Sequence, residues 1–244
     1  MKKYFLALLF LMAVTPVHAA SPCLPYHGET MHFSVGWEFV NAGTATMRFS
    51  RQGDSGYRVD TDARTNKFFD IFKKVRDTIV SEGVCINSKP QSTLFDLEQH
   101  ERKYHAKKRT DYFWKENKVR YTHNKNSENF DVPAGHLNVL DAFFLTRTLP
   151  VKKNKVLKIP VFDSRKLYEI EVRLLKTETI RAPWGEKVEC LVIEPKLKTE
   201  GIFSSVGTMK VWLTNDKRRI PLKMTAKIKI GHIVARLTGY VPAS

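Results

Sequence analysis

The sequence predicts an all-β fold, mainly antiparallel, with one or two short helices. Between residues 220 and 230 apolar and polar residues alternate strictly, and this period places all the apolar side chains on one face of a strand. Turn-forming residues separate such segments, for example at 215–218 and 231–232. Apolar residues recur at helical spacing within 66–75 and 135–149.

The N-terminal residues predict export. Lys2 and Lys3 precede an apolar run at 4–14, and a small-residue cleavage site ends at Ala19. We expect residues 1–19 to be a signal peptide cleaved after Ala19, and residues 20–244 to form a single antiparallel β domain. The apolar run is too short to span a bilayer comfortably, and we expect no transmembrane segment in the mature chain.

The chain is strongly basic. Its formal net charge is +16 over 244 residues, of which +14 remains when Lys2 and Lys3 leave with the signal peptide. This charge predicts an anionic neighbour, such as a lipid, a glycolipid or an acidic protein, although it also serves solubility alone. Export makes nucleic acid an unsuitable partner.

Three cysteines, Cys23, Cys85 and Cys190, allow three pairings in an oxidising compartment. We favour a Cys23–Cys85 disulfide, because it would fix the N-terminal segment. Cys190 lies in an apolar run at 188–193 and is expected to be a buried free thiol. No spacing resembles a zinc site, so neither a metal nor a cofactor is expected.

The first strands form hairpins, followed by a short helix. Residues 31–39 and 45–50 alternate on either side of Asn41-Ala42-Gly43, and residues 57–61 continue the sheet. In the helix, Phe68 and Phe72 belong to an apolar stripe flanked by lysines. This stripe either faces a core or groove or makes an interfacial membrane contact.

Residues 77–86, 92–97, 110–114 and 119–121 predict further strands, with an exposed ribbon tip at 98–109. His100 and His105 are five residues apart. In one strand they would lie on opposite faces, which argues against a shared metal ion. We expect a polar loop at 123–131.

The second helix is expected within 135–149, capped by Asn138 and packed on the concave face of the sheet. Its inward stripe lines a hydrophobic groove or fills the core, and comprises Val139, Leu140, Phe143, Phe144 and Arg147. A hairpin at 156–175 and strands at 188–194 and beyond follow, for about eleven strands in all.

The C-terminal meander supplies a candidate binding face. Turning the chain at 216–217 and 231–232 puts its apolar residues on one side. The opposite, basic face carries the candidate ligand-binding residues Lys210, Trp212, Lys223, Lys227, Lys229, Arg236 and Tyr240. The predicted register sets Lys227 opposite Arg236, a repulsive pair that an anion would relieve.

Three sequences stand out: Gly-Thr-Met-Lys-Val-Trp-Leu-Thr-Asn-Asp at 207–216, Arg-Arg-Ile-Pro at 218–221, and Lys-Ile-Gly-His-Ile-Val-Ala-Arg-Leu at 229–237. With the hairpin at 36–43 and the helix end at 143–147, they resemble the exported bacterial family catalogued as domain of unknown function 3108. The resemblance implies a Gram-negative periplasmic protein. It also implies a curved, incompletely closed β-barrel wrapped around a helix, similar to lipoprotein-carrier-like envelope proteins. It supplies no catalytic residues.

The sequence contains no nucleophile elbow, metalloprotease motif, phosphate loop or dinucleotide fingerprint. Asp216 is interpreted as a turn residue. We therefore expect a non-enzymatic periplasmic cell-envelope protein that binds a hydrophobic or anionic ligand, such as a lipid, a glycolipid or a lipidated peptide. The alternatives are an envelope scaffold with a filled core and a protein partner, and a hydrolase acting on an envelope polymer.

Overall fold

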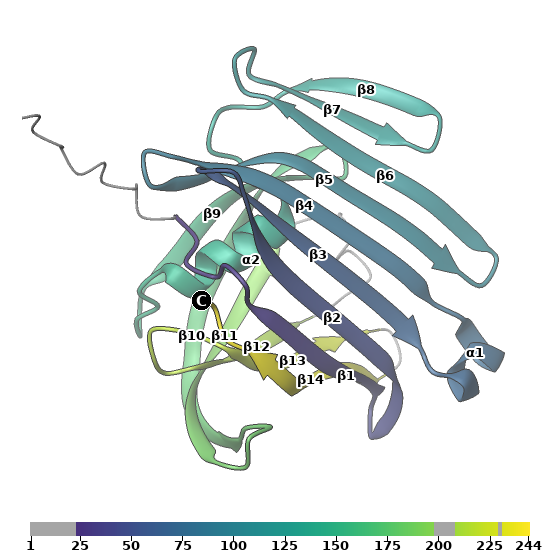
Figure 1. Ribbon diagram of the computed structural model, residues 1–244, viewed down its shortest axis with the longest axis vertical. Coiled ribbons are helices and arrows are strands. Elements are labelled where there is room, and N and C mark those ends of the chain that lie inside the picture. The colour runs from purple at the N-terminus through teal and green to yellow at the C-terminus, as the bar shows by residue number, and fades with distance from the viewer. Residues whose placement is uncertain (1–22, 198–207, 229–230) are drawn as a thin grey trace, which may run out of the picture.

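Fourteen antiparallel strands form one curved sheet in the computed structural model, which describes residues 23–197, 208–228 and 231–244 (Figure 1). The strands follow in the order β8-β7-β6-β5-β4-β3-β2-β1-β14-β13-β12-β11-β10-β9. Their bounds are β1 Thr30–Trp37, β2 Val40–Gln52, β3 Gly56–Thr65, β4 Arg76–Ile86, β5 Lys89–Glu101, β6 Tyr104–Phe113, β7 Lys118–His123, β8 Asn126–Asp131, β9 Val156–Asp163, β10 Lys166–Arg181, β11 Lys187–Leu197, β12 Met209–Thr214, β13 Pro221–Lys227 and β14 His232–Val241. The helices are α1 (Lys67–Lys73) and α2 (Val139–Thr148).

The sheet curls around α2 but does not close, so the predicted fold class is confirmed (Figure 1). The edge strands β8 and β9 are not neighbours in the sheet, and side chains join the two edges instead. The rings of Phe130 and Phe162 lie 5.4 Å apart, and Arg165 pairs with Glu128. The molecule is therefore an incompletely closed barrel, in which side chains rather than a hydrogen-bonded ladder connect the two edges of the sheet.

The predicted cap and inward face of α2 are confirmed. The Asn138 side chain accepts hydrogen bonds from the backbone N–H groups of Leu140 and Asp141, which are unpaired donors at the helix start. Leu140 and Phe144 are buried, and the Phe144 ring lies 5.1 Å from that of Phe49 on β2. Burying a side chain of this size stabilises the fold by roughly 1.5–3 kcal/mol.

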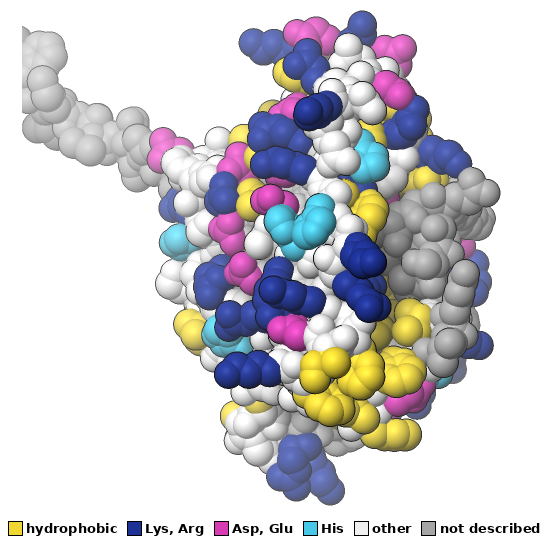
Figure 2. Space-filling view, turned by 90° about the vertical axis from the view of Figure 1, so that its right-hand side faces the viewer, with side chains coloured by type: hydrophobic (Ala, Val, Ile, Leu, Met, Phe, Trp, Pro, Cys, Tyr) yellow, Lys and Arg dark blue, Asp and Glu magenta, His cyan; other side chains and the backbone are white. Residues whose placement is uncertain are grey.

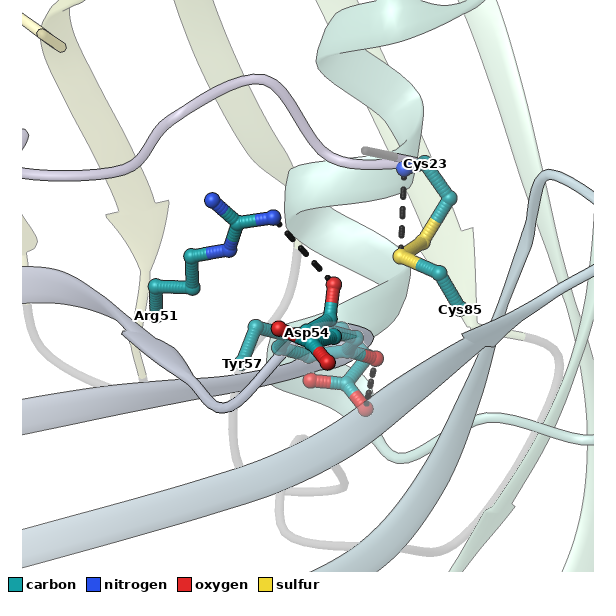
Figure 3. Close-up of a disulfide and its surroundings, with 6 residues drawn as sticks. Cys23, Arg51, Asp54, Tyr57 and Cys85 are labelled. Atoms are coloured by element: carbon teal, nitrogen blue, oxygen red, sulfur yellow. Dashed lines mark hydrogen bonds between the residues drawn. A yellow bond between two sulfur atoms is a disulfide. The ribbon is translucent and has the colours of Figure 1, made fainter. Parts of the chain in front are cut away.

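The predicted disulfide between Cys23 and Cys85 is present, with a Cα–Cα distance of 5.5 Å. Figure 3 shows it beside α2, where it ties the N-terminal segment to β4. Cys190 is a buried free thiol, as expected. Burial raises the pKa of this thiol to about 11, which leaves it protonated and unreactive at neutral pH.

Two expectations for the middle of the chain were wrong. The segment predicted as a polar loop contains β8, which pairs with β7, and the described strands number fourteen rather than about eleven. His100 and His105 do share a face: they are direct partners on β5 and β6, with ring centroids 5.1 Å apart. The chain turns between them, so they do not lie on one continuous strand.

Candidate ligand-binding groove

An apolar groove of about 690 Å³ opens at the α1 end of the curved sheet. Side chains and backbone from β1, β2, β3, β14 and α1 build it. Its lining comprises Val35, Trp37, Val40, Ala42, Gly43, Thr44, Ala63, Arg64, Thr65, Phe68, Phe69, Phe72, Lys73, Val75 and Ile233. The volume falls within the range of about 300–1,000 Å³ that is typical of small-molecule sites.

Residues at the start of α1 fix the helix over the groove. Asn66 caps it by accepting from the Phe69 N–H at 3.0 Å, and its amide donates to the Asn41 carbonyl at 2.8 Å. Asp70 accepts from Thr65 and pairs with Arg76 at 2.7 Å. The Arg76 and Thr65 hydrogen bonds lower the pKa of the Asp70 carboxyl. Seven residues are too few for a stable isolated helix, so these contacts hold it.

The apolar side of α1 is not sealed against the sheet. Phe68, Phe69 and Phe72 contact one another, with centroid distances of 5.6 to 6.3 Å. Both Phe68 and Phe72 line the groove and remain 61% exposed. These two predicted residues are therefore groove residues and not core residues.

The other predicted hydrophobic residues lie around α2. Leu140 and Phe144 belong to the buried core, so they fill the concave side rather than line a groove. Phe143 is partly buried and borders a cleft of about 80 Å³ between α2 and strands β10 to β12. The sheet is thus filled around α2 and hollow near α1.

The densest buried polar cluster surrounds Asp141 of α2. Its carboxylate accepts hydrogen bonds from the hydroxyls of Tyr57, Ser81 and Ser92 and from the Asn138 amide. Burial raises the pKa of Asp141 to about 6, against the opposing effect of these donors. Because Asp141, Ser81 and Ser92 are fully buried, the cluster joins α2 to β3, β4 and β5 and offers no access to a substrate.

A buried ion pair fixes the other end of α2. Arg147 donates to both carboxylate oxygens of Glu29 at 2.6 and 2.7 Å, and its guanidinium lies 3.9 Å from the Tyr26 ring centre. It also donates to the carbonyls of Arg218 and Arg219. These bonds use the fork of donors that distinguishes arginine from lysine.

The basic outer face forms, but with a different register. Lys223, rather than Lys227, is the partner of Arg236, and Lys227 pairs with His232. β13 ends at Lys227 and β14 begins at His232, so the turn is longer than the two-residue turn predicted. Burial, then the charge of Arg236, lowers the pKa of Lys223. Lys229 lies outside the described residues.

Trp212 is on this face but is not a free contact. It is 6% exposed, with the Lys223 ammonium 4.3 Å from its ring centre, and its indole donates to Glu178 at 3.2 Å. Lys210 and Lys176 are close enough to depress the pKa of Lys223 further. The cluster around Lys223 therefore keeps the predicted excess of positive charge, with one acid inside it.

Tyr240 does not belong to the outer face, contrary to the prediction. The register between β1 and β14 shifts between His32 and Phe33, with Thr238 the extra residue on β14. This bulge reverses the alternation, and the Tyr240 hydroxyl donates to buried Glu29 at 3.0 Å. Burial raises the pKa of Tyr240 well above its usual value.

The described residues were compared with the requirements of a metal site and of a membrane-spanning helix. No group of three or more His, Cys, Asp or Glu side chains among them is placed to hold a metal ion. None of the helices in the described ranges is long and apolar enough to cross a bilayer.

The fold places the chain among β-barrel-like proteins whose sheet is not closed. A crystal structure described as a beta-barrel-like protein of domain of unknown function DUF1849, from Brucella abortus, is similar at a TM-score of 0.57. The match covers 91% of this chain and 100% of the other at 10% identity, so it shows a shared fold alone. Residues 31–238 match the family described as "Protein of unknown function (DUF3108)", and the chain belongs to that family. A comparison with curated proteins finds no match.

Proposed function

We propose that this chain is an exported cell-envelope protein that holds the acyl chain of a lipid, a glycolipid or a lipidated peptide in the groove beside α1. The observation that carries the proposal is the groove itself, which is almost wholly apolar and borders aromatic side chains left exposed. Because Phe68 and Phe72 are each 61% exposed, the burial they forgo is worth roughly 1–2 kcal/mol for each, and a bound acyl chain would recover part of it.

The charge around the groove supports an anionic headgroup. Residues 64–76, which include α1, contain Arg64, Lys67, Lys73, Lys74 and Arg76 against the single acid Asp70. Arg64 and Lys73 themselves line the groove. An acyl chain on the apolar floor would therefore place its polar end among basic side chains. The +14 expected for the mature chain favours the same class of ligand.

The test has two parts. Protein purified from its native compartment is extracted with solvent, and the extract is examined by mass spectrometry for a stoichiometric lipid. Delipidated protein is then titrated with a fluorescent fatty acid in solution. We expect saturable binding at one site, which Ala63→Trp abolishes because the new side chain fills the groove at a lining position.

Ala134→Trp is the matched control, because Ala134 is exposed in the segment between β8 and α2 and does not line the groove. It should bind the probe as the wild type does. The proposal fails if no lipid is extracted and the probe does not saturate. It also fails if the two tryptophan variants bind equally.

A second candidate is an envelope scaffold, supported by the filled interior around α2, where Phe144 is completely buried. A scaffold would need no ligand and would retain one protein partner at fixed stoichiometry. Affinity purification from the native envelope, with the Ala63→Trp variant in parallel, separates the two. A partner recovered equally with both proteins, together with an empty groove, favours the scaffold.

A further inference from the structure

The α1 end of the molecule carries a concentration of exposed large apolar side chains. Phe39, in the β1–β2 turn, is fully exposed, and Ile71 on α1 is 74% exposed. Trp37, Val40, Phe68 and Phe72 are exposed beside them. Figure 2 shows hydrophobic side chains gathered at the lower end of this face, next to lysine and arginine side chains. We call the β1–β2 turn (residues 37–40) and α1 together the apolar tip.

The two parts of the tip are held together and belong to one structure. The Asn66 backbone donates to the Ala42 carbonyl at 2.8 Å, and its side chain donates to Asn41. The turn itself is fixed to β14, since the Glu38 N–H donates to the His232 carbonyl at 2.8 Å. Phe39 and Ile71 are therefore displayed on a supported surface.

Basic side chains surround the tip. The β5–β6 turn packs beside α1, because the Arg102 backbone donates to the Lys74 carbonyl at 2.8 Å. Lys73 pairs with Glu101, whereas Lys67, Lys74 and Lys103 have no ion pair among the described residues. Exposed apolar side chains with unpaired lysines beside them fit the interface of an anionic bilayer.

We propose that the apolar tip docks this protein on an anionic membrane surface, with Phe39 and Ile71 inserted among the acyl chains and the lysines at the headgroups. The inference rests on the proposed function, since the tip adjoins the groove and would bring its mouth to the source of the ligand. A membrane fits better than a protein partner because the exposed apolar side chains of the tip lie beside Lys67 and Lys74, which have no ion pair among the described residues. Aromatic and basic side chains are the usual anchors at a bilayer interface.

Vesicle flotation tests the docking without the groove. The full-length mature protein is mixed with vesicles of phosphatidylcholine, with or without phosphatidylglycerol. We expect retention on the phosphatidylglycerol vesicles that falls with added salt. Phe39→Ser/Ile71→Ser should weaken retention about 10-fold or more, because both side chains leave the apolar phase. Lys67→Glu/Lys74→Glu should weaken it by roughly 20-fold or more.

Neither Phe39 nor Ile71 lines the groove, so the serine variant should bind the fluorescent fatty acid in solution as the wild type does. This result distinguishes a failure of docking from a failure of the groove. Ile86→Ser/Val156→Ser removes two exposed apolar side chains outside the tip and should not change retention.

Three results would overturn the proposal. The first is that the wild-type protein floats with neither vesicle. The second is that the serine variant at the tip is retained as well as the wild type. The third is that Lys223→Glu/Arg236→Glu, on the basic outer face, abolishes retention while the tip variants leave it intact, which would assign the anionic contact to β13 and β14.

Discussion

Substitution of Asp141 by asparagine tests the physical account of the interior. Asp141 is completely buried and accepts hydrogen bonds from Tyr57, Ser81, Ser92 and Asn138. Asparagine keeps the shape and one acceptor oxygen, and a serine hydroxyl can rotate to accept from the new amide. The variant should therefore fold, and the chief change is the loss of a titrating group.

Burial raises the pKa of Asp141 from 3.8 to about 6, so the folded protein binds this proton more tightly than the unfolded chain. The stability it contributes is complete below about pH 4 and is lost as the pH rises to about 6. At 1.36 kcal/mol per pKa unit, the loss amounts to about 3 kcal/mol. Above that window the contribution is constant.

Urea unfolding at a series of pH values from about 4 to 7 measures this effect. The free energy of unfolding of the wild type, minus that of Asp141→Asn, should fall by about 3 kcal/mol across the window, while other groups cancel in the difference. Asp62→Asn, at a half-exposed carboxylate on β3, is the control for replacing an aspartate at the surface. Parallel curves for the wild type and Asp141→Asn would refute the assigned shift.

Two further predictions concern the α2 end of the fold. Glu29→Gln should lower the free energy of unfolding by about 3–5 kcal/mol, because it leaves the Arg147 guanidinium charged and unpaired in the interior, and adding Arg147→Met should recover part of the loss. Equal urea midpoints for the wild type and Glu29→Gln would contradict this. Replacing Cys23 and Cys85 by serine should lower the free energy of unfolding by about 4 kcal/mol, since the disulfide joins residues 62 positions apart. Cys190→Ala should change the thermal midpoint little. A thermal midpoint of the wild type that reductant does not lower would contradict the first expectation.

Local patterns were sufficient to predict the elements near which the candidate site is built. The helical spacing of Phe68 and Phe72 predicted α1, and the apolar stripe after the Asn138 cap predicted α2. Both signals depend only on neighbouring residues, so they can be read without the fold. The disulfide followed from counting cysteines and from the position of one of them near the terminus.

Features that depend on register could not be predicted in the same way. The bulge at Thr238 moves Tyr240 from the outer face to the interior, and nothing in the alternation from His232 to Leu237 announces it. The length of the β13–β14 turn moved the partner of Arg236 from Lys227 to Lys223. The bulge adds one residue and so reverses the face on which Tyr240 lies, whereas the longer turn shifts the pairing by an even number of residues and keeps the same buried face. The alternation of the sequence does not distinguish registers that bury the same face.

The polar interior could not be predicted because its members come from distant elements. Asp141 meets Tyr57, Ser81 and Ser92 across sequence separations of 49 to 84 residues. The one local signal is an acid three residues after a capping asparagine, in a helix whose first seven residues are otherwise apolar. The position of Tyr57 also explains the glycine at position 83, because a Cβ at Gly83 would overlap the Tyr57 ring that Asp141 holds in place.

The two ends of the curved sheet are held by contacts of different strength. At the α2 end, the Arg147–Glu29 pair and the Asp141 cluster are buried and the disulfide is partly buried, and each ties α2 or the N-terminal segment to the sheet. At the α1 end, the stabilising contacts are a helix cap and surface ion pairs, each of which contributes about 1 kcal/mol or less. Aromatic side chains are exposed there around the apolar groove. Opening or repacking α1 is consequently far less costly than disturbing α2. The proposed acyl-chain site would use this asymmetry: the α2 half preserves the curve of the sheet, and α1, held by weaker contacts, can yield to a ligand.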